Sequence, residues 1–305
     1  MGRDTVILQA VPTRRFPDYW RKAFTPQISR VKRLAAGLPK RYAFRSLIGR
    51  GSAAYVVLAD DLDGHTKVAV KILRPDTSTL VGENRFRREI EILRQLDHPN
   101  ILPLLDHGST VQGSLFLVTP FVDGETLRTR LLREKRLEVA DAIAIAGGVA
   151  SALDEAHRRG LIHRDIKPSN VLLSDSRVIV ADFGISRTMV IEQNKPITIS
   201  GATLGTPEYM SPEQIGGEVE LDARSDVYAL GCVVYEMLGG KPPFTGSLAK
   251  VFTSQRNEAP RPLREVRPAV PAGVDAAVMK SLAKQRGSRF ETAGEFARAL
   301  VVAGI

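Results

Sequence analysis

Two glycines near the start of the chain have the spacing of a phosphate-binding loop. Gly49 and Gly51 stand in the stretch IGRGSAAYVVLADD, residues 48–61, and Ala54 occupies the third position, where many such loops have glycine. Glycine has no Cβ, so its backbone can approach a phosphate closely. The G-x-G-x-x-A pattern is compatible with a dinucleotide-binding loop, with a hairpin that covers nucleotide phosphates, and with a turn that binds nothing.

The residues after the loop distinguish these interpretations. A dinucleotide-binding loop leads into a helix whose N-terminal amides meet the pyrophosphate. Here the next residues are aromatic, β-branched or aliphatic, namely Tyr55, Val56, Val57 and Leu58, and the turn DDLDG and the segment HTKVAVKIL follow. This is the pattern of a β-hairpin, and it argues against a dinucleotide-binding unit. A turn without a ligand stays open while the loop is considered alone.

The hydrophobic periodicity predicts a strand-rich first part that contains one helix. Phe86, Ile90, Leu93 and Leu96 recur at helical spacing in ENRFRREIEILRQL, and the sequence HPN then ends the helix. We expect two short strands to follow, one around Leu104 and one in SLFLVT. From Thr126 onward the pattern is mainly helical, with a long helix closed by Gly160 and later helices at residues 223–238, 271–284 and 291–303.

Length and composition limit the class of protein. The 305 residues are enough for two modest domains or for one domain with two lobes, and 43% hydrophobic and 25% charged residues are ordinary for a globular protein. The single cysteine, Cys232, excludes an internal disulfide framework and a cysteine-based zinc site. Its apolar surroundings, YALGCVVYEML, predict a buried packing position rather than a reactive thiol.

The net charge of +9 is concentrated in the first 41 residues. They hold three lysines and seven arginines against two aspartates. We expect residues 1–41 to form a basic N-terminal extension. It could bind nucleic acid, an acidic partner or an anionic surface, or it is a solvated extension with one short helix packed on the folded body. Trp20 and Phe24 favour some apolar docking.

Membrane attachment is not expected from this sequence. No apolar run is long enough to span a membrane, and the N-terminus lacks the pattern of a signal peptide. In MGRDTV, Val6 stands where an N-myristoylation motif requires Ser or Thr. We therefore expect a cytoplasmic protein without a transmembrane segment.

The order of several short motifs is specific. The loop glycines are followed by VAVK at 68–71, a helical glutamate, HRDIKPSN at 163–170, DFG at 182–184 and SPE at 211–213. In this order the chain resembles the protein kinase family over roughly residues 42–302. The phrases HPNI, HRDIKPSN and GTPEYMSPEQ resemble the bacterial eukaryotic-type (Hanks-type) serine/threonine protein kinases.

The resemblance implies an α+β, bilobal kinase-like fold. A small β-rich N-lobe with the glycine loop and the hinge would span residues 42–122. A larger helical C-lobe with the catalytic loop and the activation segment would span residues 123–305. The implied activity is transfer of the γ-phosphoryl group of MgATP to serine or threonine hydroxyls of proteins, with Mn²⁺ as an alternative metal. A homodimer is left open.

Two other classes share part of this pattern. Small-molecule phosphotransferases have the H-x-D-x-x-x-x-N spacing but lack an activation segment like the one here. A nucleotide-binding pseudokinase that acts through partner binding is the remaining alternative, because Ala54 departs from the family pattern. Ala54 can be accommodated if its φ stays negative. The chain retains Lys71, Asp165, Asn170 and Asp182, which favours the active enzyme.

The resemblance assigns nucleotide binding mainly to the first lobe. Lys71 would reach the α- and β-phosphates, although a lone strand lysine is more often solvated. Glu89 would be its helical partner, and Glu91 is a competitor on a different face of the helix. Thr119 would be the gatekeeper before the hinge. The other residues expected to contact ATP are Ile48, Gly49, Gly51, Val56, Ala69, Pro120, Val122 and Leu172.

The resemblance places the chemistry in HRDIKPSN and DFG. Asp165 would accept or orient the substrate hydroxyl proton, and Lys167 would face the γ-phosphate. Asn170 and Asp182 would hold magnesium. Phe183, His163, Leu93 and Leu104 would form an apolar column.

Further residues would support this site. Thr206 is expected beside Asp165 and Lys167. Glu213 is expected to form a buried ion pair with Arg289, and Asp226 to accept hydrogen bonds from the HRD backbone.

The resemblance also implies control by phosphorylation. Arg164 puts a positive charge beside Asp165, and in similar kinases a phosphate on the activation segment balances it. Thr198 and Ser200 are the candidate sites, eight and six residues before Thr206; an unmodified polar loop is the alternative. Because Ser169 and Thr126 are neutral where arginine-seeking relatives have carboxylates, we expect no strong preference for arginine upstream of the phosphorylated residue.

Overall fold

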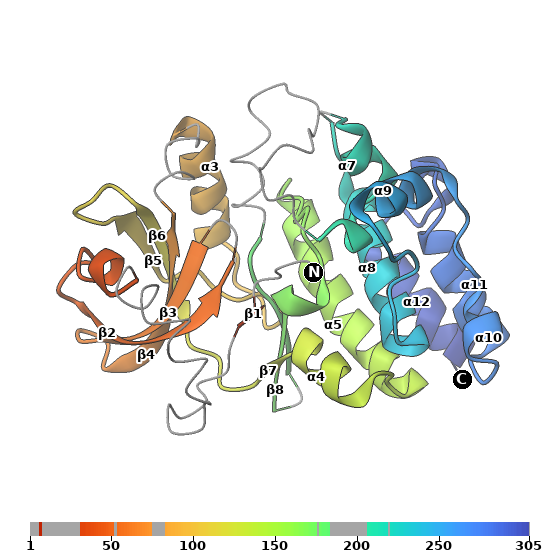
Figure 1. Ribbon diagram of the computed structural model, residues 1–305, viewed down its shortest axis with the longest axis horizontal. Coiled ribbons are helices and arrows are strands. Elements are labelled where there is room, and N and C mark those ends of the chain that lie inside the picture. The colour runs from red at the N-terminus through yellow and green to blue at the C-terminus, as the bar shows by residue number, and fades with distance from the viewer. Residues whose placement is uncertain are drawn as a thin grey trace. The chain divides into compact units, whose positions relative to one another are not determined.

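The protein divides into two compact units, which we call the N-lobe and the C-lobe (Figure 1). This computed structural model describes residues 6–7, 31–51, 54–74, 83–175, 177–183, 206–218 and 220–304. The N-lobe comprises Met1–Arg94 and Leu102–Gly124, and the C-lobe comprises Gln95–Ile101 and Glu125–Ile305. The N-lobe is built on a sheet and the C-lobe mainly on helices, which confirms the expected α+β class.

The N-lobe contains a six-stranded antiparallel sheet with the strand order β1-β2-β3-β4-β6-β5. Its elements are β1 (Val6–Ile7), β2 (Tyr42–Arg50), β3 (Ala54–Asp61), β4 (Thr66–Leu73), α3 (Glu83–Arg94), β5 (Asp106–Ser109) and β6 (Leu115–Pro120). The strand expected around Leu104 begins two residues later, at Asp106. Pro103, which has no N–H to donate to a ladder, precedes it.

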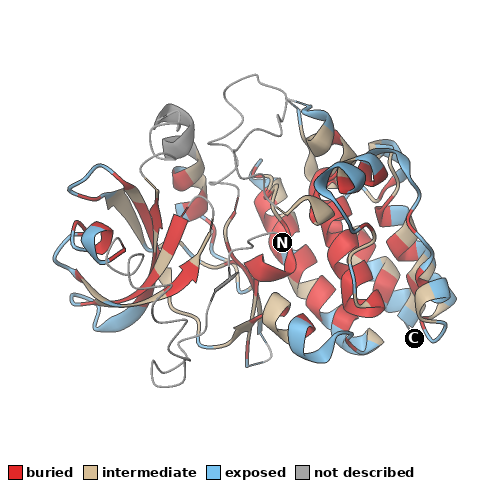
Figure 2. Ribbon diagram, in the orientation of Figure 1, coloured by how far each residue is buried: buried red, intermediate tan, exposed pale blue. Residues whose placement is uncertain are grey.

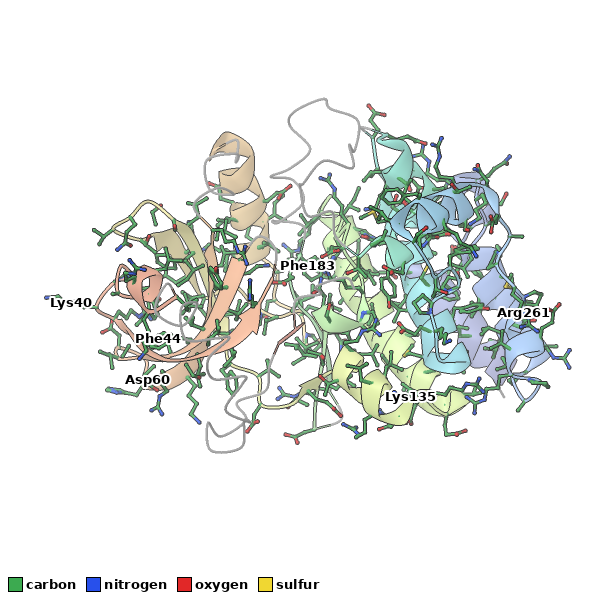
Figure 3. All side chains as sticks on the ribbon, viewed as in Figure 1. Lys40, Phe44, Asp60, Lys135, Phe183 and Arg261 are labelled. Atoms are coloured by element: carbon green, nitrogen blue, oxygen red, sulfur yellow. The ribbon has the colours of Figure 1, made fainter. Side chains whose placement is uncertain are left out.

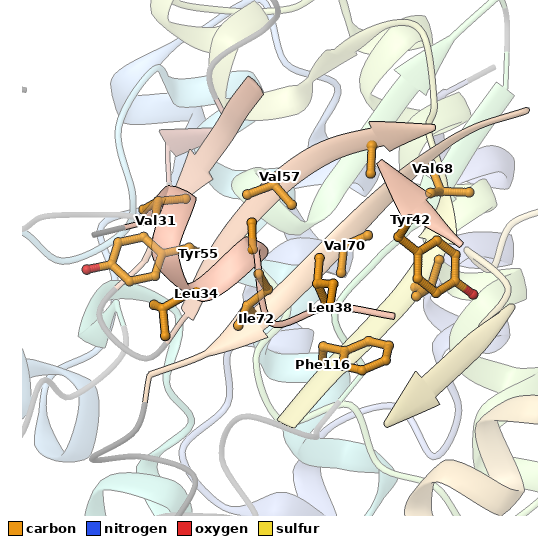
Figure 4. Packing of buried hydrophobic residues seen from close by; sticks show 13 residues of the cluster. Val31, Leu34, Leu38, Tyr42, Tyr55, Val57, Val68, Val70, Ile72 and Phe116 are labelled. Carbon is orange, nitrogen blue, oxygen red and sulfur yellow. The ribbon is translucent and has the colours of Figure 1, made fainter. Parts of the chain in front are cut away.

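One face of the N-lobe sheet is covered by a short helix at residues 31–35 (Figure 4). Alternate residues of β3 and β4 point to this face, and the helix and the turn after it add four apolar side chains. The cluster consists of Tyr42, Tyr55, Val57, Ala59, Val68, Val70, Ile72, Phe116 and Val118 from the strands and Val31, Leu34, Ala35 and Leu38 from the helical segment. Part of the segment expected to be a basic extension is therefore core. Lys32 and Arg33 of this helix are exposed, and Trp20 and Phe24 lie outside the described residues.

The C-lobe combines a small sheet with helices. Its strands pair antiparallel in the order β7-β8-β9, with β7 at Glu125–Thr126, β8 at Val171–Ser174 and β9 at Arg177–Val180. Its α-helices are α4 (Leu127–Glu134), α5 (Val139–Arg158), α7 (Pro212–Gly216), α8 (Ala223–Gly239), α9 (Leu248–Asn257), α10 (Leu263–Val266), α11 (Ala272–Ser281) and α12 (Ala293–Gly304). Short 3₁₀ turns are η2 (Pro168–Asn170), η3 (Pro207–Tyr209) and η4 (Arg286–Ser288).

Residues 95–101 belong to the C-lobe because their backbone is tied to β9. The side chain of Asn100 donates to the carbonyl of Val178 at 2.7 Å, and the Val180 amide donates to the Asn100 carbonyl at 2.8 Å. His98 Nε2 lies 3.1 Å from Ser151 Oγ on α5. The HPNI segment, residues 98–101, therefore follows α3 in the chain but packs as part of the C-lobe.

Helix α8 is the centre of the C-lobe (Figure 2). Every residue from Ser225 to Gly239 is buried, as expected of a helix that packs on all sides. Cys232 is fully buried in it, and burial raises the pKa of its thiol to about 12. The expected packing role of this cysteine is confirmed. Within the described part of the chain, no helix is both long and apolar enough to cross a membrane.

Candidate active site

The glycine hairpin accommodates Ala54 without strain. Ala54 is the first residue of β3, pairs with Leu73 of β4 and is 4% exposed. Its carbonyl accepts a hydrogen bond from the Gly51 amide at 2.9 Å, which closes the turn. Ala54 is not among the non-glycine residues with a positive φ in the described chain. A Cβ therefore fits an extended strand position, and the backbone does not require a third glycine there.

Several residues expected to contact the nucleotide share one face of the N-lobe sheet. Val56 lies opposite Lys71 in the β3–β4 ladder, and Thr119 lies opposite Ala69 in the β4–β6 ladder. Opposite residues in a ladder point to the same side of a sheet, and Ala69 and Lys71 are two residues apart. These four side chains therefore occupy the face away from the buried cluster that contains Val70. Thr119 Oγ1 also lies 3.5 Å from the Ala69 carbonyl.

The remaining nucleotide candidates lie on β2, on α3, at the end of β6 and on β8. Ile48 and Gly49 are in β2, where the ladder to β3 has an irregularity between Leu47 and Gly49. Glu89 is half-buried on α3 and Glu91 is exposed, which favours Glu89 as the inward carboxylate. Pro120 ends β6 opposite Val68, Val122 follows it half-buried, and Leu172 pairs with Thr126 and Ile179 in the C-lobe.

Asp226 at the start of α8 anchors the backbone of the catalytic loop. Its carboxylate accepts hydrogen bonds from the amides of His163 and Arg164, each at 2.8 Å, and from His157 Nε2 at 2.8 Å. Burial acts to raise the pKa of Asp226, but the hydrogen bond from His157 and the neighbouring groups hold it below its ordinary value. Asp226 is therefore a buried carboxylate that fixes two consecutive amides.

Arg164 is held in a conformation that few side chains adopt. Its φ is +66°, in the left-handed region. Asp226 binds its amide, and Gln214 Nε2 donates to its carbonyl at 2.8 Å. Such backbone strain, about 1–3 kcal/mol for one residue, persists only where neighbours enforce it. Asp182, with a φ of +64°, is the second non-glycine residue of this kind in the candidate site.

Asp165, Lys167 and Asn170 form one contact unit. Lys167 Nζ lies 2.9 Å from Asp165 Oδ2, and the Lys167 side chain is 10% exposed. Asn170 Nδ2 donates to the Asp165 carbonyl at 2.8 Å and approaches Asp165 Oδ2 at 3.2 Å. The amide nitrogen of Asn170 thus faces Asp165, which leaves its side-chain oxygen as the atom chemically suited to a hard cation.

The DFG segment is attached to the catalytic loop. The Ala181 amide donates to the Asn170 carbonyl at 2.9 Å, and His163 Nε2 lies 3.0 Å from the Ala181 carbonyl. Phe183, labelled in Figure 3, packs its ring on His163 with 4.5 Å between the ring centroids. Burial lowers the pKa of His163. The carboxylate residue Asp182 is thereby fixed between two anchored neighbours, and with Asn170 it offers the oxygen donors that magnesium prefers.

The supporting residues lie on the elements that follow the activation segment. Thr206 is half-buried and precedes η3. Glu213 on α7 and Arg289 form a buried ion pair. Thr198 and Ser200 lie outside the described residues, as do Ser52 and Ala53 of the glycine loop. Leu93 and Leu104 belong to the N-lobe and the ring pair of His163 and Phe183 to the C-lobe.

Two residues of the site were not found from the sequence. Gln214 has a recognisable signal, because Ser211 and Gln214 form an S-x-x-Q capping box at the start of α7. The second function of Gln214, its bond to Arg164, depends on tertiary structure. His157 lies near the end of α5 among polar residues, and no local pattern in HRRG distinguishes it from a solvated histidine.

The fold and the site define a protein kinase. A family model described as "Protein kinase domain" matches residues 42–284, and the chain belongs to this family. Members of this family use ATP and a divalent metal ion. The expected resemblance to bacterial serine/threonine protein kinases is confirmed by curated relatives.

Two such relatives are serine/threonine-protein kinase PknB of Mycobacterium tuberculosis and probable serine/threonine-protein kinase PknB of Bifidobacterium longum. The chain is 40% identical to the first over 270 residues, which cover 87% of this chain and 43% of the relative. It is 40% identical to the second over 267 residues, which cover 84% and 38%. The chain therefore spans less than half the length of these relatives.

Solved structures agree with this assignment. The crystal structure of the Mycobacterium tuberculosis PknI kinase domain matches with a TM-score of 0.71 and 30% sequence identity. The match covers 88% of this chain and 99% of that domain. The chain is similar to a complete kinase domain in that structure.

Proposed function

We propose that this chain is a catalytically active serine/threonine protein kinase that transfers the γ-phosphoryl group of MgATP to protein hydroxyls. The observation that supports this proposal most is the unit in which Lys167 and Asn170 both contact Asp165. A carboxylate held beside an ammonium group, with an amide oxygen nearby for a metal, is suited to orienting a hydroxyl and stabilising charge on a phosphoryl group.

Each residue of the C-lobe site has a distinct role in this reaction. Asp165 orients the serine or threonine hydroxyl and accepts its proton as the oxygen attacks the γ-phosphorus and the bond to the β-phosphate oxygen breaks. Lys167 supplies positive charge at the transferring group. Magnesium, or alternatively manganese, would be held by Asn170 and Asp182 and would neutralise charge on the phosphates.

Residues of the N-lobe would bind the nucleotide. Lys71 contributes the charge for the α- and β-phosphates, with Glu89 as its partner, and the glycine hairpin covers the phosphates. The other residues expected to contact ATP are Ile48, Gly49, Gly51, Val56, Ala69, Pro120 and Val122 of the N-lobe and Leu172 of the C-lobe. The shared sheet face of Val56, Ala69 and Lys71 supports this assignment.

The pseudokinase alternative rests on Ala54 alone. Because Ala54 is an ordinary extended strand residue, its Cβ is a weak reason to expect loss of turnover. The alternative predicts ATP binding without transfer, and the active-enzyme proposal predicts both.

The test compares wild-type protein with Asp165→Asn and Asp182→Ala, using labelled MgATP and a generic serine-containing acceptor protein. Loss of the base is expected to lower the transfer rate by roughly 10²–10⁴-fold, and loss of the metal ligand by roughly 10²–10³-fold or more. Asp175→Asn is the matched control, because Asp175 is an exposed turn residue with a φ of +45° that asparagine tolerates. Wild-type protein that binds MgATP without labelling the acceptor or itself would support the pseudokinase instead.

Autophosphorylation of the activation segment is a second part of the proposal. Hydrogen bonds to its amide and to its carbonyl fix the backbone of Arg164 next to Asp165, so this residue brings a positive charge to the catalytic loop. A phosphate on Thr198 or Ser200 would bring a charge of about −1.5 to −2 and could balance it. After incubation with MgATP, mass spectrometry should find phosphate on one of these residues. The Thr198→Ala, Ser200→Ala double variant should lose most activity, and Thr253→Ala, on an exposed position of α9, should not.

We further propose that the kinase does not require arginine upstream of the phosphorylated residue. Thr126 and Ser169 are neutral at the two positions where arginine-seeking relatives have carboxylates. Thr126 caps α4 by accepting a hydrogen bond from the Thr129 amide, and Ser169 is 5% exposed. The nearby carboxylate of Glu125 is bound by Arg133 at 2.5 and 2.7 Å. A peptide array in which arginine at the second or third upstream position dominates would contradict this expectation.

A further inference from the structure

A buried glutamine on α9 binds the backbone of η3. Gln255 is 0% exposed. Its Nε2 donates to the carbonyls of Glu208 at 2.7 Å and Pro207 at 3.3 Å, and its Oε1 accepts a hydrogen bond from the Tyr228 hydroxyl. A side-chain amide has two N–H donors and one oxygen acceptor. Both the nitrogen and the oxygen of the amide have hydrogen-bond partners, as a buried polar group requires.

Lys284 fixes the helix end that carries Gln255. Its ammonium group donates to the carbonyls of Ser254 at 3.1 Å and Gln255 at 2.8 Å, and to the Tyr228 hydroxyl at 3.2 Å. The last carbonyls of a helix have no partner within the helix, and a cation there is favourable. The same group lies 4.3 Å from the centroid of the Phe244 ring. Lys284 and Tyr228 thus limit the movement of the Gln255 amide.

The turn held by Gln255 is connected to the catalytic loop. Residues 210 and 211 follow η3 directly, and Ser211 forms the capping box with Gln214 at the start of α7. Gln214 in turn donates to the carbonyl of Arg164, the residue before Asp165. On its other side η3 is held by Tyr209, whose hydroxyl donates to Glu236 Oε2 at 2.5 Å. Gln255 therefore fixes one end of a chain of contacts that reaches the residue adjacent to Asp165.

We propose that Gln255 is a positioning residue for the protein-substrate side of the kinase reaction. By holding the carbonyls of Pro207 and Glu208, it orients η3 and the preceding Thr206, where the acceptor segment would lie if the proposed function holds. All contacts of Gln255 and Lys284 described above are with C-lobe residues, and none of them is a residue expected to bind the nucleotide. Loss of the Gln255 amide should therefore lower kcat/KM for the acceptor peptide and leave the KM for ATP unchanged.

The kinetic test uses Gln255→Met, which keeps the length of the side chain and removes its hydrogen bonds, and Gln255→Glu, which keeps only the acceptor. Misplacement of a site by about 1 Å can lower a rate by about 10²-fold, so we expect roughly a 10- to 100-fold loss of kcat/KM for the acceptor peptide in both variants. The KM for ATP should stay within about twofold of wild type. Val278→Ala, a fully buried position on α11, is the control for general loss of stability.

A second measurement does not depend on activity. The amides of Tyr209 and Met210 donate to the carbonyls of Thr206 and Pro207 within η3. Hydrogen exchange at these two amides should become faster in Gln255→Met than in Val278→Ala at matched stability. Unchanged exchange at both amides in Gln255→Met would overturn the proposal. Unchanged kcat/KM for the acceptor peptide in an active Gln255→Met enzyme would also overturn it, and so would an equal loss of kcat/KM in Val278→Ala. An inactive wild type would contradict the proposed function alone, because the exchange result still decides whether Gln255 holds the turn.

Discussion

Arg289 binds the carboxylate of Glu213 through both of its terminal nitrogens. Nη1 donates to Oε1 at 2.7 Å and Nη2 to Oε2 at 2.9 Å, and the two side chains are 0% and 3% exposed. The other three N–H groups of Arg289 donate to the carbonyls of Ala283, Arg224 and Lys284. Burial acts to raise the pKa of Glu213, but Arg289 holds it below the ordinary value. A fully satisfied guanidinium group thus joins α7 to the segment before α12.

Breaking this pair from one side should destabilise the fold. In Arg289→Met the Glu213 carboxylate stays buried without its cation, and in Glu213→Gln the guanidinium group loses its anion. Each variant should lose about 3–5 kcal/mol of unfolding free energy, measured by urea denaturation. The matched control is Arg286→Met, which breaks an exposed pair with Glu218 of similar length, 2.9 Å. That control should lose at most about 1 kcal/mol. Equal losses in the two arginine variants would contradict the importance of burial.

Acid should destabilise the folded protein by protonating Asp61. Arg41 donates to both carboxylate oxygens, at 2.7 and 2.8 Å, and this hydrogen bonding holds the pKa of Asp61 at about 2, below its ordinary 3.8. A carboxyl group whose pKa is lower in the folded state contributes its full stability above the unfolded pKa and loses it as the pH falls toward the folded pKa. The contribution should therefore be present above pH 4 and decline between pH 4 and pH 2.

The measurement is urea denaturation at several values of pH between 5 and 2.5. Asp61→Asn should be less stable than wild type at pH 5, and the difference between the two should shrink toward pH 2.5. Asp63→Asn is the control, because Asp63 is 72% exposed and lies 3.4 Å from the same Arg41. A difference between wild type and Asp61→Asn that stays constant across this range would show that the ion pair does not set the acid sensitivity.

Cys232 should be inert in the folded protein. It is the only cysteine of the chain, it is fully buried in α8, and burial raises the pKa of its thiol to about 12. Because the thiolate is the reactive form, neither access nor ionisation favours reaction at neutral pH. A thiol reagent such as dithionitrobenzoate should label the native protein only at the rate of unfolding and should label it at once in denaturant. Immediate labelling of one thiol in native protein would place Cys232 at the surface.

The sequence predicted those features that rest on local pattern or on motif order. The β-hairpin after Gly51 and the buried cysteine in α8 follow from residues that are close together in the chain, and the kinase family follows from the order of motifs between residues 49 and 213. The charge of residues 1–41 predicts a basic extension, with one short helix packed on the folded body as an alternative for part of it. The helix at residues 31–35 packs in this way, because Val31 and Leu34, with Leu38 after the helix, enter the buried cluster on the sheet.

Long-range polar contacts could not be read from the sequence. The left-handed backbone of Arg164 depends on Asp226, 62 residues away, and on Gln214, 50 residues away. No local propensity encodes such a conformation for arginine, because its cost is met by partners that only the folded chain supplies. The same holds for Gln255, whose surroundings in α9 give no sign that its amide is buried.

The last prediction concerns Ala54 and the glycine hairpin. Because Ala54 is an extended strand residue that accepts from Gly51 and pairs with Leu73, replacing it with glycine adds freedom to the unfolded chain and to the loop without relieving any strain. Ala54→Gly should therefore lose about 0.5–1 kcal/mol of unfolding free energy. It should change the KM for ATP modestly and should not create activity.

Ala59→Gly, at a buried position of the same strand, is the control for the stability effect alone. Urea denaturation and steady-state kinetics with varied ATP measure the two effects. A wild type without turnover combined with an active Ala54→Gly variant would overturn the assignment of an active kinase and identify Ala54 as the residue that disables it.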